Sequence, residues 1–275
     1  MKTANNTRLP IGVFDSGVGG LTVLKALREE LPHEDLIYLG DTARLPYGTK
    51  SPASISRYAC QAARLLQQRD IKLLVVACNT ATAVALDALR AQMHPLPVIG
   101  VVGPGASAAV AARPGGRHLV LATEATVRLG AYRRAIQELD PAASVRELAC
   151  ELLVSLAEEG WTNGPIPAAI IDRYLQSLGA DAAELNSVIL GCTHFPLLRG
   201  AISAAFAADV SVVDSASTTA TVARDMLQTM GLANESGHNG SLVLLATDGT
   251  SRFARVGGWF LGKKLSAEDV TLVDL

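Results

Sequence analysis

The chain has 275 residues, of which 49% are hydrophobic and 18% are charged, and its formal net charge is −2. Its length corresponds to about two domains at roughly 150 residues per domain. The apolar content excludes extensive disorder. The balance of 24 basic against 26 acidic residues provides no positive field for nucleic acid or an anionic membrane. We therefore expect a folded protein that has neither nucleic acid nor a membrane as a partner.

The sequence carries no sign of export. Its start is polar, and Asp15 with several glycines interrupts the first apolar stretch, which does not fit a signal peptide. The uncharged stretch 95–112 contains prolines and glycines that would break a spanning helix, so we expect a buried strand that leads through a loop into a helix. Four cysteines are too few for a disulfide framework in a chain of this size. We expect reduced thiols in a cytoplasmic protein.

Short apolar runs alternate with segments of helical period along the chain. Strands are predicted at 11–14, 36–39, 73–77, 98–102, 119–121, 188–190, 210–213 and 242–245. Ser51 before Pro52 predicts the start of a helix that continues to about Arg69. The alternation predicts an α/β fold with parallel sheets covered on both faces. Functional groups on such sheets gather beyond the carboxyl ends of the strands.

Two predicted strand ends share a pattern. Each apolar run leads to a cysteine that is followed by hydroxyl or amide side chains and then by a helical segment. The two segments are Cys78-Asn79-Thr80 and Cys192-Thr193-His194. An internal duplication into two similar α/β domains explains the repeat, although polar residues at strand ends are common enough for it to arise by chance.

The two strand-end cysteines are suited to chemistry. At a helix N-terminus, the helix dipole and the free N–H groups lower a thiol pKa below its usual value of about 8.5. Cys78 and Cys192 are therefore candidates for proton transfer or nucleophilic attack, with His194 as a proton partner. Cys60 and Cys150 have no polar flank and are expected to be small buried residues. The spacing of Cys192 and His194 does not fit zinc, so we expect no metal.

Two carboxylates also follow predicted strands. Asp15 and Ser16 precede a glycine-rich turn at 17–20, which does not match the dinucleotide fingerprint or a P-loop. The turn either needs glycine torsions or cradles an anion on its N–H groups, and Asp15 could bind an amine or orient a thiol. Asp41 is a candidate for acid–base support or a turn cap, and a turn at 46–48 could offer N–H groups to a carboxylate. No cofactor motif is present, so we expect side chains alone to do the chemistry.

Five segments together resemble the glutamate racemase family, in its order and at its spacing. They are residues 12–20, 40–42, 46–48, 77–81 and 191–194. The resemblance implies a cofactor-independent enzyme that interconverts L- and D-glutamate and supplies D-glutamate for peptidoglycan. It also implies two pseudo-symmetric parallel-sheet α/β domains with the active site between them, and a homodimer. The expected domains are residues 1–100 with 214–275, and residues 101–213.

The resemblance also assigns roles to individual residues. Cys78 and Cys192 resemble the two acid–base cysteines, with Asp15 and Asp41 supporting Cys78, and His194 and Glu158 supporting Cys192. The family's substrate contacts fall on Asp15, Ser16, Tyr47, Gly48, Asn79, Thr80, Thr193 and His194. The chain departs from the family at Glu151, where proline is usual, and at Ala122, where glycine is common.

The chemistry agrees with this assignment. Inversion of a tetrahedral carbon needs one proton removed from one face and another delivered to the opposite face, and two thiols can do both. Asn79, Thr80 and Thr193 offer donors that can stabilise the carbanion through the α-carboxylate. The alternatives are a racemase for aspartate or another amino acid, a cysteine hydrolase with His194 as its base, and a non-catalytic anion-binding protein.

Overall fold

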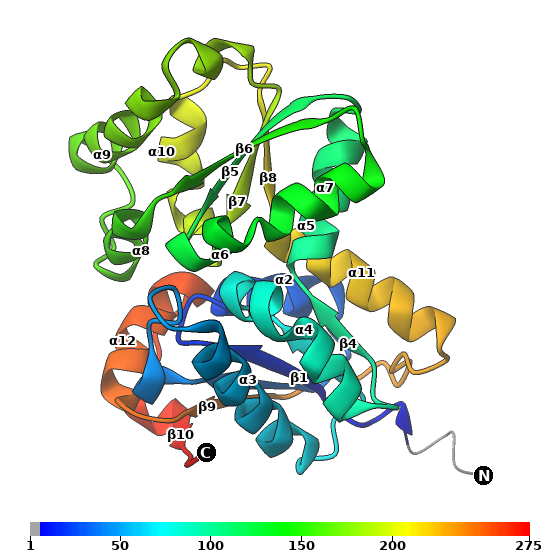
Figure 1. Ribbon diagram of the computed structural model, residues 1–275. Coiled ribbons are helices and arrows are strands. Elements are labelled where there is room, and N and C mark those ends of the chain that lie inside the picture. The colour runs from blue at the N-terminus through cyan, green and yellow to red at the C-terminus, as the bar shows by residue number, and fades with distance from the viewer. Residues whose placement is uncertain (1–5) are drawn as a thin grey trace. The chain divides into compact units, whose positions relative to one another are not determined.

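The computed structural model describes residues 6–275, except for the side chains of residues 180–183. The chain forms two compact units (Figure 1). Unit 1 contains the chain up to Val101 together with Ala216–Leu275, and unit 2 is Val102–Ser215. These limits lie within two residues of the domain limits expected from the sequence. The expected α/β fold with two parallel sheets is confirmed.

Unit 1 is built on a six-stranded parallel sheet with the order β10-β9-β2-β1-β3-β4. Its strands are β1 (Ile11–Asp15), β2 (Leu36–Gly40), β3 (Leu73–Val76), β4 (Val98–Gly100), β9 (Leu242–Ala246) and β10 (Val270–Leu272). β1 to β4 come from the first hundred residues, and β9 pairs with β2. The C-terminal part of the chain therefore completes the first sheet.

Helices cover both faces of the sheet in unit 1. They are α2 (Leu21–Glu30), α3 (Pro52–Gln67), α4 (Asn79–Met93), α11 (Ser215–Thr229) and α12 (Thr250–Leu261), with short 3-10 turns η1 (Thr42–Arg44) and η4 (Ala267–Asp269). α3 and α4 pack on the face that presents Phe14 and Val76 (Figure 1). Tyr38 points to the other face, where its ring meets Phe253 of α12. The alternation follows from the period of two along a strand.

The start of α3 illustrates how local sequence sets an element. Ser51 has extended backbone torsions, and its side chain accepts a hydrogen bond from the Ser54 N–H at 3.3 Å. Pro52 occupies the first turn, where its missing N–H costs nothing. The predicted start is correct, and the helix ends at Gln67, two residues before the predicted end.

Unit 2 is built on a four-stranded parallel sheet with the order β6-β5-β7-β8. Its strands are β5 (Arg117–Ala122), β6 (Ser144–Ala149), β7 (Ser187–Gly191) and β8 (Ser211–Asp214). Its helices are α5 (Val102–Ala112), α6 (Glu124–Leu129), α7 (Ala131–Leu139), α8 (Glu151–Glu158), α9 (Pro165–Leu175) and α10 (Arg199–Ala204), with 3-10 turns η2 (Gln176–Glu184) and η3 (Phe195–Leu198).

The two sheets repeat one strand order. In each unit, the second strand along the chain lies at one side of the first, and the third and fourth follow on the other side. β2-β1-β3-β4 of unit 1 thus corresponds to β6-β5-β7-β8 of unit 2. This common order supports the internal duplication suggested by the two similar strand ends.

The eight predicted strands are all present, and two further strands were missed. The missed strands, β6 and β10, lie at sheet edges and are partly exposed, so charged or polar residues interrupt their apolar pattern. The strand predicted at 98–102 ends at Gly100, and α5 begins at Val102 without the expected loop. Within residues 6–275, no helix is long and apolar enough to cross a membrane.

Candidate functional site

The two candidate cysteines lie just beyond the third strand of their own sheets. Cys78 follows β3 after one residue, and Cys192 follows β7 directly. Both are buried, with 6% of each residue exposed. Because the strand orders match, the two thiols occupy equivalent places in the two units.

Cys78 is the N-cap residue of α4. Its sulfur accepts a hydrogen bond from the Ala81 N–H at 3.4 Å, so the thiol lies at the positive end of the helix dipole. The Ser16 hydroxyl oxygen lies 3.5 Å from the same sulfur. Asn79 and Thr80, the next two residues, form the first turn of α4 and are both buried. The structure therefore brings four of the predicted site residues of unit 1 together.

The glycine-rich turn holds the carboxylate of Asp15. Asp15 is the last residue of β1 and is 1% exposed, and its Oδ2 accepts a hydrogen bond from the Gly17 N–H at 2.9 Å. A Cβ atom at Gly20 would lie 2.5 Å from the Asp15 Cβ, so only glycine fits there. The turn thus uses at least one of its N–H groups for its own carboxylate.

Asp41 lies in a separate buried network. Its carboxylate accepts hydrogen bonds from Arg44 Nε at 2.8 and 3.0 Å, from the Tyr47 hydroxyl at 2.5 Å and from Thr247 Oγ1 at 3.1 Å. The guanidinium of Arg44 also lies over the Tyr58 ring, 4.3 Å from its centroid. The contacts of Asp41 therefore lead to the turn at 46–48, while its predicted support of Cys78 stays a prediction.

The turn at 46–48 carries the predicted contacts Tyr47 and Gly48, and both are buried. The Tyr47 ring packs against Phe14 and Tyr58, with centroids 6.3 and 6.0 Å apart. Burial and the Asp41 carboxylate raise the pKa of Tyr47 far above its ordinary value, so this phenol stays protonated and donates to Asp41. The network thereby fixes the shape of the turn.

Cys192 lies at one end of a thiol–imidazole–carboxylate line. Its sulfur is 3.7 Å from His194 Nδ1, and His194 Nε2 is 3.1 Å from Oε1 of Glu158 at the end of α8. Burial lowers the pKa of His194, but the hydrogen bonds and charges of Cys192 and Glu158 outweigh it and raise this pKa to about 10. The structure thus brings together the three residues that the resemblance grouped, with Thr193 buried beside them.

The other two cysteines have the expected structural character. Cys150 is fully buried, and burial raises its pKa to about 12, which leaves it a protonated and unreactive thiol. Cys60 lies partly exposed within α3. All four cysteines are free thiols. Among the residues that the structure describes, no group of three or more His, Cys, Asp or Glu could hold a metal ion.

Sequence reasoning missed two partners of Asp41, Arg44 and Thr247. Arg44 has a local signal, because it follows Asp41 by three residues and can reach back to it. Thr247 has none, because it is 206 residues away along the chain. Tyr38 was also missed, since within an apolar strand it looks like an ordinary core residue.

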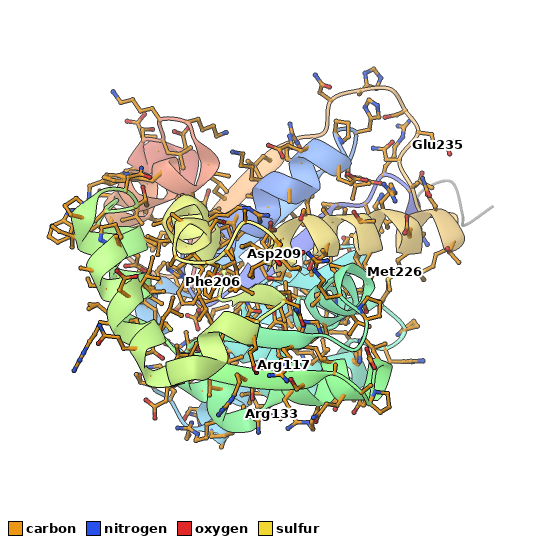
Figure 2. All side chains as sticks on the ribbon, turned by 90° about the horizontal axis from the view of Figure 1, so that it is seen from above. Arg117, Arg133, Phe206, Asp209, Met226 and Glu235 are labelled. Carbon is orange, nitrogen blue, oxygen red and sulfur yellow. The ribbon has the colours of Figure 1, made fainter. Side chains whose placement is uncertain are left out.

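The structure also has surface hollows away from the two strand-end cysteines. One of about 670 Å³ in unit 2 is lined by Asn186, Phe206 and Asp209, among others, and the latter two are labelled in Figure 2. These residues precede β7 and β8, whereas Cys192 follows β7. The hollow is therefore at the opposite end of the sheet from the cysteine.

Comparison with known proteins identifies the family. The family model described as Asp/Glu/Hydantoin racemase matches residues 11–223. The chain is 47% identical over 265 residues to the glutamate racemase of Geobacter metallireducens. The aligned region covers 96% of each protein. The chain belongs to the glutamate racemase family. The resemblance found in the sequence is thereby confirmed.

Solved structures of glutamate racemases agree with this assignment over both units. An isoform from Bacillus anthracis matches with a TM-score of 0.91 and 35% identity, covering 98% of each chain. The enzyme from Francisella tularensis, solved in complex with D-glutamate, matches with a TM-score of 0.88 and 35% identity, covering 97% of this chain and 98% of that one. The region matched by the family model includes every predicted catalytic residue.

Proposed function

We propose that this protein interconverts L- and D-glutamate by two-base proton transfer at Cα, with Cys78 and Cys192 as the two bases. The observation that carries the proposal is the equivalent position of the two thiols, one beyond the third strand of each sheet, each among polar groups. Glutamate as the substrate is supported by the relatives, which are glutamate racemases at 41–47% identity.

In the proposed reaction, one cysteine acts as a thiolate and the other as a thiol. The thiolate takes the Cα proton, and the thiol delivers its own proton to the opposite face of the carbanion. The sulfur that took the proton is then the thiol, and the other is the thiolate, so the reverse reaction exchanges their roles. Proton transfer by positioned groups of this kind contributes about 10²–10⁴-fold to a rate.

Each cysteine has a positively polarised group beside its sulfur, of a different kind in each unit. Cys78 has the helix N-terminus and the Ala81 N–H. Cys192 has His194, whose raised pKa keeps the ring cationic at neutral pH, with Glu158 on its far side. Neither device needs a metal or an organic cofactor, and we propose that the reaction uses none.

Binding of the substrate is proposed to rest on buried polar groups near each cysteine. Asn79 and Thr80 at the start of α4, and Thr193 after β7, can donate to the α-carboxylate and so stabilise the negative charge that develops in the transition state. Asp15, Ser16 and His194 are the remaining proposed contacts. Tyr47 and Gly48 belong to the same set, and Asp41 would contribute by holding their turn in place.

The proposed cellular role is the supply of D-glutamate for peptidoglycan, in the cytoplasm and as a homodimer. This part rests on the family resemblance.

The test is an incubation of the purified protein with L-glutamate in heavy water, without added cofactor. Loss of the Cα proton signal in NMR should accompany the decay of the optical rotation to zero, and the same should happen from D-glutamate. A parallel incubation with aspartate is expected to show neither change. Absence of exchange with glutamate would refute the proposal, and exchange with aspartate alone would favour the alternative substrate.

A further inference from the structure

Tyr38 is a fully buried tyrosine whose hydroxyl group binds the backbone of the turn that carries Asp15. The hydroxyl donates a hydrogen bond to the Gly17 carbonyl oxygen at 2.9 Å. Burial and, after it, the negative charge of the Asp15 carboxylate raise the pKa of Tyr38, so the phenol stays protonated and donates to Gly17. Gly17 lies in the turn at 15–20, which begins at Asp15, the last residue of β1.

The ring of Tyr38 is also held by a packing contact. It packs against Phe253 of α12, with the ring centroids 6.0 Å apart. A Cβ atom at Gly40 would lie 2.3 Å from the Gly17 carbonyl oxygen, so a glycine in β2 lets the turn approach the sheet. The backbone of the turn is therefore pressed against β2 at the place where the Tyr38 hydroxyl binds it.

The same turn faces the catalytic cysteine of unit 1. Ser16 lies between Asp15 and Gly17 in the chain, and its hydroxyl oxygen is 3.5 Å from the Cys78 sulfur. A displacement of the turn would therefore move the groups around Cys78.

We propose that Tyr38 is a positioning residue, whose hydroxyl group clamps the 15–20 turn and so sets how Asp15 and Ser16 lie against Cys78. Tyr38 does not touch the substrate in this scheme. The Ser16 hydroxyl group, 3.5 Å from the Cys78 sulfur, can donate to a thiolate there, so its displacement would favour the protonated thiol. The catalytic part of this inference rests on the proposed function, but the effect on Cys78 does not.

The direct test is the reactivity of each thiol in Tyr38→Phe. This variant keeps the ring on Phe253 and loses only the hydroxyl group. Alkylation of the full chain by iodoacetamide is followed from pH 6 to pH 10, and peptide mass spectrometry reports Cys78 and Cys192 separately. The midpoint for Cys78 is expected to move to higher pH by about 0.5–1 unit, so its alkylation rate near neutral pH falls about three- to tenfold.

The internal control is Cys192 in the same molecules, whose midpoint should not change. Tyr174→Phe is the matched variant, because its hydroxyl group likewise bonds the backbone, accepting from the Leu152 N–H at 3.1 Å. That variant should leave both midpoints in place. An unchanged or lowered midpoint for Cys78 in Tyr38→Phe, or an equal shift at both cysteines, overturns the proposal.

A second measurement uses glutamate deuterated at Cα. Because the equilibrium constant of a racemase is 1, any loss of kcat/KM in the variant must be equal in the two directions. The isotope effect on kcat/KM can still differ between the two directions. In Tyr38→Phe it should rise only for the enantiomer from which Cys78 takes the proton. Equal changes for both enantiomers count against the proposal. If the wild-type protein racemises nothing, the proposed function fails, while the alkylation result still decides the role of Tyr38.

Discussion

The imidazole of His194 joins a sulfur on one side to a carboxylate on the other, and its charge depends on both. The ring is buried, which by itself would favour the neutral form. Cys192 and Glu158 reverse this preference and raise the pKa to about 10. At neutral pH the cation therefore lies 3.7 Å from the Cys192 sulfur.

Glu158→Gln tests this chain of charges. The amide can still meet the ring, but the negative charge is lost, so the pKa of His194 should fall from about 10 toward its ordinary value of 6.5. We expect kcat to drop about 100-fold. NMR titration of the His194 ring and the pH profile of kcat measure the two effects. Glu159→Gln is the matched control, since Glu159 is exposed and adjacent, and it should change neither.

The same shift has a consequence for stability. Because the folded-state pKa of His194 is raised, the proton bound to it stabilises the folded state fully below pH 6.5, and this contribution is lost as the pH rises through about 10. The free energy of unfolding of the wild-type protein should therefore decline over this range more steeply than that of Glu158→Gln. Parallel declines in urea titrations would contradict the raised pKa.

The two proposed bases, Cys78 and Cys192, should be needed equally. Cys78→Ala and Cys192→Ala each remove one of the two bases, so each should lower racemisation by at least about 10²–10⁴-fold in both directions. Cys60→Ala, on the partly exposed part of α3, should stay within about twofold of the wild type. Polarimetry from both enantiomers measures this. A variant that lacks either base and keeps near-normal turnover would rule out the two-base scheme.

At the scale of elements, the segment that contains η1 and the 46–48 turn is held from two sides. Asp41 binds Arg44 and Tyr47 within the segment, and Thr247 binds it from beyond β9. Thr42 Oγ1 adds a bond to the Asp248 carbonyl oxygen at 2.6 Å. The position of this segment therefore depends on its hydrogen bonds to the C-terminal part of unit 1. These bonds help to hold the proposed contacts Tyr47 and Gly48 in place.

Tyr47→Phe is predicted to loosen this segment. The ring still packs on Phe14 and Tyr58, but the buried Asp41 carboxylate loses a donor, which costs about 1.5–3 kcal/mol of unfolding free energy. The KM for glutamate should rise several-fold more than kcat falls, because the turn that is proposed to bind the substrate is displaced. Urea unfolding and steady-state kinetics measure both. Tyr58→Phe, whose hydroxyl bonds no other described residue, should leave both values near those of the wild type.

At the scale of the whole molecule, a buried ion pair holds the segment around residues 232–234, through which the chain returns to the sheet of unit 1. Lys72 and Glu34 lie just before β3 and β2, and their side chains are only 1% and 3% exposed. Lys72 also donates to the carbonyl oxygen of Leu232 at 2.8 Å, and Glu34 accepts from the Asn234 N–H at 2.8 Å. The pair therefore anchors the segment that enters unit 1 before β9.

Lys72→Met should be strongly destabilising. It leaves the carboxylate of Glu34 buried without its cation, which costs about 3–5 kcal/mol. Lys72→Met combined with Glu34→Gln should recover part of this loss, because the second change removes the unpaired charge. Urea unfolding of the three proteins measures the difference. A double variant less stable than the single one would show that the charge is not the cause.

Local pattern was enough to find most of the fold. The eight predicted strands exist because buried parallel strands are continuous apolar runs, which are visible in the sequence. β6 and β10 were not predicted, because neither forms a continuous apolar run. β6 is partly exposed along its length, and β10 has only three residues. Cys78 and Cys192 were found for a related reason, since a cysteine followed by polar residues stands out after an apolar strand.

The sequence by itself determined the alternation of strands and helices, the two strand-end cysteines and the family of this protein. Each depends on residues close together in the chain. Only the tertiary structure decided that Asp41 pairs with Thr247, and that Tyr38 binds the turn of Asp15. Those contacts join residues up to 206 positions apart, and a hydrogen bond depends on where folding brings two groups, which no local pattern records.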